Sequence, residues 1–266
     1  MDILKRNVAP LAKETWDEID ETAKDVITNI IAGRKVVSVE GPKGWDYTSV
    51  DIGRLKDQEE KSVKLGEVRA STYEVKELTE ARVSFELSKW ELDNVLRGAK
   101  DVELDALEEA CKELALFEER AIFNGYVDGD IEGLTQVAAK TMSLGSSGDS
   151  IVKAIGEAVY TLMEAHVAKP YDLVVSPEIY DVINIISEGA YLPKIIESII
   201  GGMIIRSKVI DGAVLLPHKD EDFELTIGQD FSVGYESETE DTVRLFVTES
   251  FTFRVLDEGK VVHFTI

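Results

Sequence analysis

The sequence predicts an α+β fold, and three observations carry this prediction. Apolar residues recur at helical spacing in two long stretches, from about Pro10 to Gly33 and from Asp105 to Phe123. Apolar and polar residues alternate along TVRLFVTESFTFRVL, residues 242–256, as they do in a half-buried strand. Between residues 150 and 216, helical and strand patterns follow one another. Helical and strand segments combined in this way indicate a mixed domain with packed layers.

The first helix is predicted to open near Pro10. Thr15 and Glu18 have the spacing of a capping box, and the pattern ends before Gly33. A helix with one apolar stripe packs against another element. The stripe consists of Trp16, Ile19, Ala23, Val26, Ile27 and Ile30.

Residues 34 to 80 show no helical stripe and no self-contained core. They are strand-like, highly charged and interrupted by glycines, as in VVSVEGPKGWDY and DIGRLKDQEEKSVKLGEV. A stretch of about fifty such residues is unusual inside a compact domain. The segment is therefore either disordered or an arm that packs on a neighbouring subunit, and its Val, Tyr and Leu residues favour the arm.

The helix from Asp105 to Phe123 is predicted to be the spine of the fold, and Asn124-Gly125 is a typical helix end. Cys111 lies on its apolar face, where a small buried hydrophobe is expected, and as the only cysteine it cannot form an intramolecular disulfide. The other members of that face are Leu107, Leu114, Phe117, Ala121 and Ile122.

The second half of the chain begins with a glycine-rich loop, SLGSSGDS, followed by a helix with apolar residues in register. The stretch YDLVVS then predicts a buried strand. For the long strand at 242–256, the candidate neighbours are residues 223–235 and 261–266.

Carboxylates dominate the charge: 29 Lys and Arg against 52 Asp and Glu give a formal net charge of −23. Surfaces that bind nucleic acid are basic, so no nucleic-acid partner is expected. Lys5 and Arg6 precede no apolar signal region, and YLPKIIESIIGGMII is interrupted by charges. We therefore expect an intracellular protein with no membrane partner.

No catalytic or metal-binding pattern is recognisable. His166, His218 and His263 lie far apart, and the calcium-like stretch DGDIEG lacks a carboxylate at its twelfth position, Ala139. Nucleophile-elbow, dinucleotide and phosphate-loop motifs are missing. The acidic pair Glu118-Glu119 is interpreted as a solvated helix face. The sequence thus predicts a structural or binding protein with no cofactor and no metal, rather than an enzyme.

The ordered set of segments resembles the encapsulin family, specifically family 1 encapsulin nanocompartment shell proteins. The segments run from one end of the sequence to the other: LKRNVAPLAKETWDEID, GRKVVSVEGPKGWDY, ARVSFELSKWELDNVLRG, FEERAIFNG, PYDLVVSP and IGQDFSVGYESETEDTVRLFVTESFTF.

This resemblance implies the fold of tailed-phage major capsid proteins, with a peripheral domain, an axial domain and an extended loop. The expected boundaries are 1–45 for the N-terminal helix and the start of the peripheral domain, 46–78 for the extended loop, 79–133 for the peripheral domain with its spine helix, 134–222 for the axial domain, and 223–266 for the returning peripheral strands. Chains of this length are expected to close into an icosahedral homo-oligomer of about sixty copies.

The resemblance also implies a five-fold pore and an interior pocket that holds a C-terminal targeting peptide of the cargo. The pore residues would be Glu188, Gly189, Ala190, Tyr191 and Leu192. The pocket candidates are Ile27, Ile30, Ile31, Arg34, Val37, Ser38, Phe231, Val233 and Tyr235. Apolar members would receive the peptide's side chains, and Arg34 would bond its backbone or terminal carboxylate.

The implied cargo is a ferritin-like protein or a dye-decolourising peroxidase, and iron storage or oxidative-stress defence would follow from that cargo. The shell would be a cytoplasmic nanocompartment. Two alternatives remain: a prophage-derived major capsid protein that encloses DNA, and a bacteriocin or protease. The start of the sequence at the cargo-side helix argues against the first, and the lack of an assignable nucleophile and base argues against the second.

Overall fold

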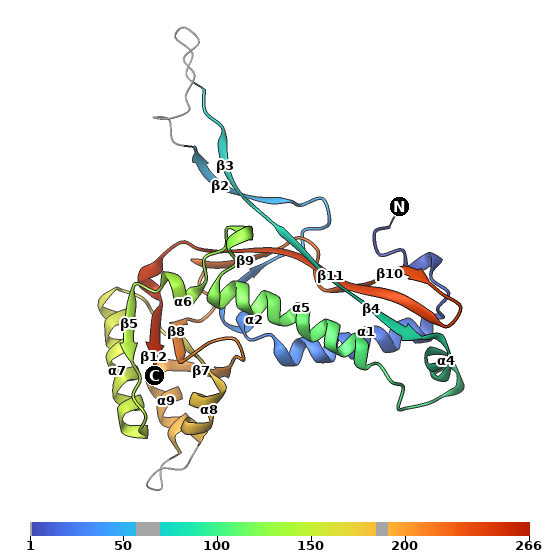
Figure 1. Cartoon of the computed structure of the whole chain (residues 1–266). Helices are drawn as coiled ribbons and strands as arrows, with labels where there is room; N and C mark the ends of the chain where they lie inside the picture. The colour runs from blue at the N-terminus through green and yellow to red at the C-terminus, as the bar shows by residue number, and fades with distance from the viewer. Residues whose placement is uncertain (1, 57–69, 185–190) are drawn as a thin grey trace.

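The structure, a computed structural model, describes residues 2–56, 70–184 and 191–266. Two five-stranded sheets, which we call the first and second sheets, carry the helices, and a two-stranded hairpin projects from one side (Figure 1). The first sheet has the order β1-β9-β11-β10, with β4 also paired to β11. Its strands are β1 (Ser38–Glu40), β4 (Thr79–Ser88), β9 (Phe223–Ile227), β10 (Ser232–Glu238) and β11 (Thr242–Val255).

The second sheet has the order β5-β12-β8-β6-β7. Its strands are β5 (Lys140–Ser143), β6 (Tyr171–Val175), β7 (Gly201–Arg206), β8 (Ala213–Pro217) and β12 (Val262–Thr265). The helices are α1 (Lys13–Ile30), α2 (Gly33–Val36), α4 (Lys89–Arg97), α5 (Asp105–Asn124), α6 (Leu134–Val137), α7 (Gly148–Glu164), α8 (Pro177–Asn184) and α9 (Leu192–Ile200), with short 3-10 turns η1 (Arg6–Val8), η2 (Val127–Gly129) and η3 (Glu258–Lys260). These separate helices and mostly antiparallel strands form the α+β fold that the sequence predicts.

The two long helices pack together against the first sheet. Helix α5 matches the predicted spine, and Cys111 is fully buried on it. Helix α1 begins at Lys13, close to the predicted start near Pro10 but before Thr15, and its N-cap, Ala12, makes no side-chain cap. The predicted capping box is therefore wrong, because the N–H of Trp16 already bonds the carbonyl of Ala12 and Thr15 lies buried within the first turn.

Strand β11 is the backbone of the first sheet. It pairs with β4 along residues 242–251, with β10 on its other edge, and with β9 at its far end. The long strand is thus confirmed, but the prediction that only one face is buried is wrong. Phe246, Thr248 and Thr252 alternate with the residues of the apolar face and are also buried, so both sides of the middle of the strand are covered.

The second sheet encloses its own core with α7, α8 and α9. The predicted strand YDLVVS is β6, and all five of its residues are buried. The prediction that residues 261–266 lie beside the long strand is wrong. After η3 the chain crosses to the second sheet, where β12 pairs with β5 and β8, because Val262 and Phe264 complete the core there.

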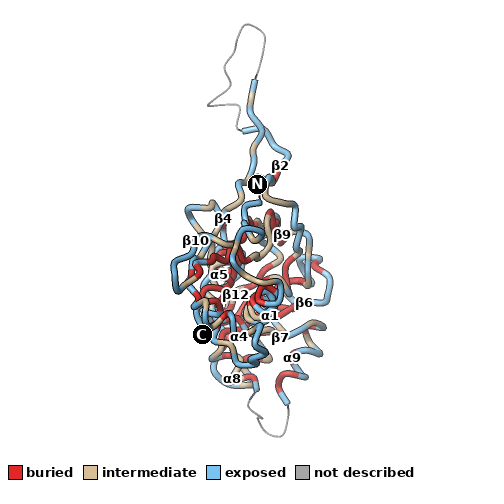
Figure 2. Tube along the Cα trace, turned by 90° about the vertical axis from the view of Figure 1, so that its right-hand side faces the viewer, coloured by how far each residue is buried: buried red, intermediate tan, exposed pale blue. Residues whose placement is uncertain are grey.

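The hairpin formed by β2 (Ser49–Leu55) and β3 (Tyr73–Glu77) has almost no core of its own (Figure 2). Val50 is buried at its base, whereas Leu55 is 45% exposed and Tyr73 75% exposed. An isolated two-stranded hairpin is marginally stable in water. This geometry fits an arm, and its packing on a neighbouring copy stays a prediction. Among the described residues, no helix is long and apolar enough to cross a membrane.

Candidate functional site

A partly open cavity of about 530 Å³ lies between α1 and the edge of the first sheet. One wall comes from the N-terminal segment and α1, and the other from α2, the loop before β10, and strands β10 and β11. The lining residues are Leu4, Arg6, Asp20, Ala23, Lys24, Ile27, Thr28, Ile31, Arg34, Asp230, Phe231, Ser232, Val233 and Val247.

Five of the nine predicted pocket residues line this cavity: Ile27, Ile31, Arg34, Phe231 and Val233. Residues 27 and 31 are one helical turn apart and therefore share a face of α1. Ser38 begins β1 and pairs with β9, so the chain carries this residue away from the cavity.

The other three predicted residues also lie outside the cavity lining. Val37 is fully buried in a different core cluster, beside β9 and the end of β11. Ile30 and Tyr235 pack around the same core as the cavity floor but do not line it.

Sequence reasoning missed several lining residues. Asp20, Lys24 and Thr28 could have been found, because they lie one or two helical turns before Ile27 or Ile31 and so share the same face of the helix. Leu4 gave no local signal: its carbonyl accepts a hydrogen bond from Tyr235, which ties the N-terminal segment to β10 at 2.8 Å.

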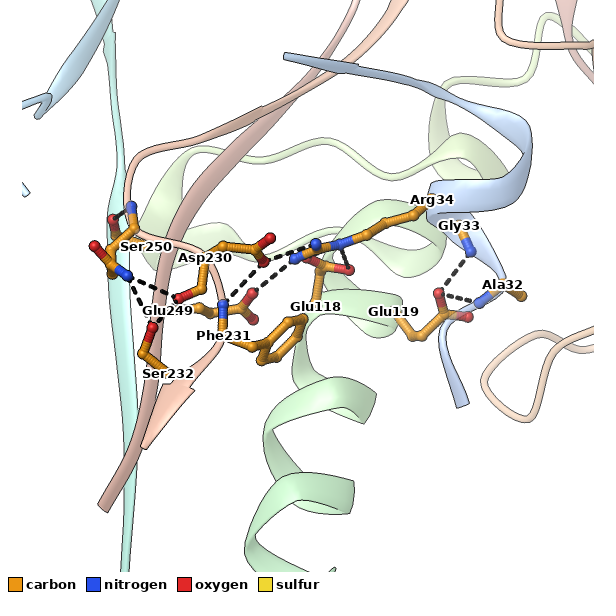
Figure 3. Close-up of polar contacts among 11 residues, drawn as sticks. Ala32, Gly33, Arg34, Glu118, Glu119, Asp230, Phe231, Ser232, Glu249 and Ser250 are labelled. Carbon is orange, nitrogen blue, oxygen red and sulfur yellow. Dashed lines mark hydrogen bonds and ion pairs between the residues drawn. The ribbon is translucent and has the colours of Figure 1, made fainter. Parts of the chain in front are cut away.

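Arg34 is held by three carboxylates, those of Glu118, Asp230 and Glu249 (Figure 3). We call these four residues the Arg34 cluster. Its Nε and Nη2 donate to Glu118 at 2.9 and 2.6 Å. Its Nη1 donates to Asp230 at 2.8 Å, and Nη2 lies 3.3 Å from Glu249. The guanidinium also stacks 4.7 Å from the ring centre of Phe231. These contacts engage all three guanidinium nitrogens and leave one N–H, on Nη1.

Glu118 and Glu119 are almost completely buried, so their interpretation as a solvated pair is wrong. Glu118 turns toward Arg34. Glu119 accepts hydrogen bonds from the backbone N–H groups of Ala32 at 2.8 Å and Gly33 at 2.6 Å, and Ser207 donates to its other oxygen. The pair is buried because each carboxylate meets donors from a distant part of the chain, which a helical charge pattern does not reveal.

The acidic residues around Arg34 outnumber the positive charge. Burial raises the pKa of Glu249 well above its ordinary value, with Glu118 adding to the effect and Arg34 opposing it. Burial likewise raises the pKa of Glu119 to about 7, although the N–H groups of Gly33 and Ala32 act in the opposite direction. Glu249 therefore binds a proton more readily than an exposed glutamate does.

These raised pKa values predict a stability that falls as pH rises. Both carboxyls bind protons more tightly in the folded chain than in the unfolded chain, where the pKa is near 4.5. Replacing Glu119 by Gln keeps the acceptor oxygen and removes the titration. We expect the unfolding free energy of the wild type, relative to Glu119→Gln, to fall between pH 4.5 and about 7, by up to about 1.4 kcal/mol per pH unit.

Urea denaturation in pH steps measures this difference. Glu113→Gln is the control for removing one carboxyl group, because Glu113 is exposed on the same helix. A difference between wild type and Glu119→Gln that stays constant or grows with pH would contradict the assignment.

The remaining predicted residues form no second site within the described segments. Glu188, Gly189 and Ala190 lie outside the residues that the structure describes. Tyr191 is 46% exposed, whereas Leu192 is buried against the core of the second sheet at the start of α9.

The three histidines are separate, as the sequence indicates. His218 Nδ1 lies 2.6 Å from the buried Asp172, and among the described residues no cluster of His, Cys, Asp and Glu could hold a metal ion.

Comparison with known proteins identifies the family. Residues 1–252 match the family described as "Encapsulating protein for peroxidase". The type 1 encapsulin shell protein of Mycolicibacterium paratuberculosis is 37% identical over 256 residues, 95% of each chain. That of Rhodospirillum rubrum is 34% identical over 262 residues, covering 96% of this chain and 94% of the relative. The chain belongs to the encapsulin family.

Solved structures agree with the fold of this encapsulin. A virus-like particle protein from Pyrococcus furiosus superimposes with a TM-score of 0.66 at 20% identity, over 93% of this chain and 98% of that one. The capsid of Myoviridae phage XM1 gives a TM-score of 0.56 at 14% identity, over 86% and 89%. The predicted phage-capsid-like fold is confirmed. Encapsulins are structural shell proteins, and the prediction that the chain is not an enzyme is confirmed at this family level.

Proposed function

We propose that this encapsulin closes into a cytoplasmic icosahedral shell of about sixty copies and holds a cargo enzyme by its C-terminal targeting peptide in the cavity beside α1. The cargo would be a ferritin-like protein or a dye-decolourising peroxidase. The family description, which names peroxidase encapsulation, supports the cargo class. A net charge of −23 argues against enclosed nucleic acid.

The observation that carries the proposal is the composition of the cavity. Its volume of about 530 Å³ lies within the usual range of ligand pockets, about 300–1,000 Å³. Ile27, Ile31 and Phe231 supply apolar surface, and charged groups stand around them. An extended peptide that inserts apolar side chains between a helix and a sheet edge suits such a pocket.

A weak single contact is sufficient for loading. An oligomeric cargo presents several tails inside one shell, and linked binding events raise overall avidity by about 10² to 10⁴. The expected targeting peptide therefore needs only a few apolar anchors. We further propose that residues 188–192 approach the five-fold pore, on the resemblance alone.

Replacing Phe231 by Ala is expected to lower cargo loading at least several-fold while particles still form. The ring lies on the cavity wall against Arg34, so its loss removes an apolar contact and opens the pocket. Mass spectrometry of particles purified from the native host gives the cargo and its amount per shell.

Ile30→Ala is the matched control, since Ile30 lies on the same helix as Ile27 but does not line the cavity. Equal loading of Phe231→Ala and wild-type shells would remove the pocket assignment. Nucleic acid inside wild-type particles, in place of a protein cargo, would favour the capsid alternative.

A further inference from the structure

The charged side chains around the cavity differ in the number of hydrogen bonds and ion pairs that they already make with other residues of the chain. Three cations line it: Arg6, Lys24 and Arg34. The two arginines are engaged by the protein itself. The lysine, in the part of the chain that the structure describes, makes no hydrogen bond and no ion pair.

Each of the three guanidinium nitrogens of Arg6 donates one hydrogen bond within the chain. Its Nε donates to the carbonyl of Val233 at 2.7 Å, and its Nη1 and Nη2 grip the two oxygens of Asp20 at 2.7 and 2.5 Å. The group also stacks 4.4 Å from the ring centre of Trp16. A bidentate, stacked arginine of this kind is preorganised for its own carboxylate and has little capacity for another.

Arg34 makes more ion pairs within the chain than Arg6 does. Only 14% of its side chain is exposed, and its nitrogens already serve Glu118, Asp230 and Glu249. A ligand carboxylate there would approach three acidic residues to reach one remaining N–H. Arg34 therefore holds Phe231 and Asp230 in place. It is poorly suited to bind a ligand's carboxylate, which is the role that the family resemblance implies for it.

Lys24 is exposed on α1, one helical turn from Thr28 and three residues before Ile27 on the cavity floor. The acid one turn before it on the helix, Asp20, is taken by Arg6. A flexible lysine with an unpaired ammonium beside an apolar floor is a point charge available to a ligand.

We propose that Lys24 determines the charge specificity of this cavity by pairing with a carboxylate of the bound peptide, while Arg34 only positions the cavity wall. The inference rests on the proposed function of the cavity. Its ligand is thus an apolar segment that carries a carboxylate, from an acidic side chain or from the chain terminus. The protein carries a net charge of −23, which disfavours the approach of a carboxylate. Screening limits the reach of each charge to about 8 Å, so the peptide's carboxylate needs a cation close by, and Lys24 supplies it.

The test co-expresses the shell protein with a fluorescent reporter that ends in a library of random octapeptides after a Gly-Ser linker. Particles are purified and the retained tails are sequenced by mass spectrometry. A second library with four glycines after the octapeptide moves the terminal carboxylate away, so it separates acidic side chains from the chain terminus as the source of the carboxylate.

The shell variants are Lys24→Met, which keeps the aliphatic stem, and Lys24→Glu. Lys13→Met is the matched control, because Lys13 lies on the same helix, 82% exposed and outside the cavity.

Wild-type and Lys13→Met shells are expected to enrich apolar tails with a carboxylate. Lys24→Met should reduce the preference for the carboxylate about two- to fivefold, the range for an exposed ion pair. Lys24→Glu should reverse the preference toward Lys and Arg, which a purely structural role of Lys24 would not produce. Identical tails from wild-type and both Lys24 variants would overturn the inference and leave the pocket intact. A lack of any enriched tail would overturn the proposed pocket function, and this inference with it.

Discussion

Arg34→Met is expected to lower the unfolding free energy by about 3–5 kcal/mol, the cost of leaving a buried charge without its partner. Glu118 is completely buried, and its two oxygens face the guanidinium of Arg34 at 2.6–2.9 Å. Methionine replaces the aliphatic stem but supplies no donor. Equilibrium denaturation of the purified protein in urea at neutral pH measures the loss.

A second substitution separates the charge from the packing. Adding Glu118→Gln to Arg34→Met removes the unpaired carboxylate, so the double variant should recover part of the loss. Arg97→Met is the control for removing an arginine, because Arg97 is 58% exposed and its pair with Asp93 spans 3.5 Å. That change is expected to cost less than about 1 kcal/mol. Equal losses for Arg34→Met and Arg97→Met would contradict the role given to the cluster.

Replacing Leu55, Tyr73 and Val75 by Ser is expected to abolish particle formation and leave the subunit folded. The three side chains are 45%, 75% and 38% exposed on the projecting hairpin, so their replacement should cost the isolated subunit little stability. In a shell, the same surface would be buried at every repeated contact between copies. Electron microscopy counts particles, and near-ultraviolet circular dichroism reports the fold of the subunit.

The matched control changes two exposed, oppositely charged residues of the same hairpin, Arg54→Ser and Glu77→Ser, which leaves the net charge unaltered. Particles should then form normally. Normal particles from the triple serine variant would show that the hairpin does not need an apolar partner on another copy.

Much of this fold is readable from local pattern. Helix α5, strand β6 and the missing core of the hairpin follow from the spacing of apolar residues, since each depends on neighbours along the chain. The destination of β12 is not readable in this way. Its four residues fit either sheet, and only the turn after β11 and the space left in the second core decide between them.

The candidate site likewise has features that local spacing predicts and features that depend on contacts between distant parts of the chain. Ile27 and Ile31 are one turn apart on a helix, and that spacing places them on one face. The burial of Glu118 depends on Arg34, 84 residues away in sequence. On an acidic helix the pattern indicates a solvated carboxylate, and the long-range partner that reverses this expectation leaves no local trace.

The size of the purified protein in solution tests the account most directly. A hairpin without its own core and a family of shell proteins lead us to expect hollow particles of about sixty copies of the 29.5 kDa chain, near 1.8 MDa in sedimentation analysis. A folded monomer that persists at every concentration in neutral buffer, with no hollow particles, would contradict the account.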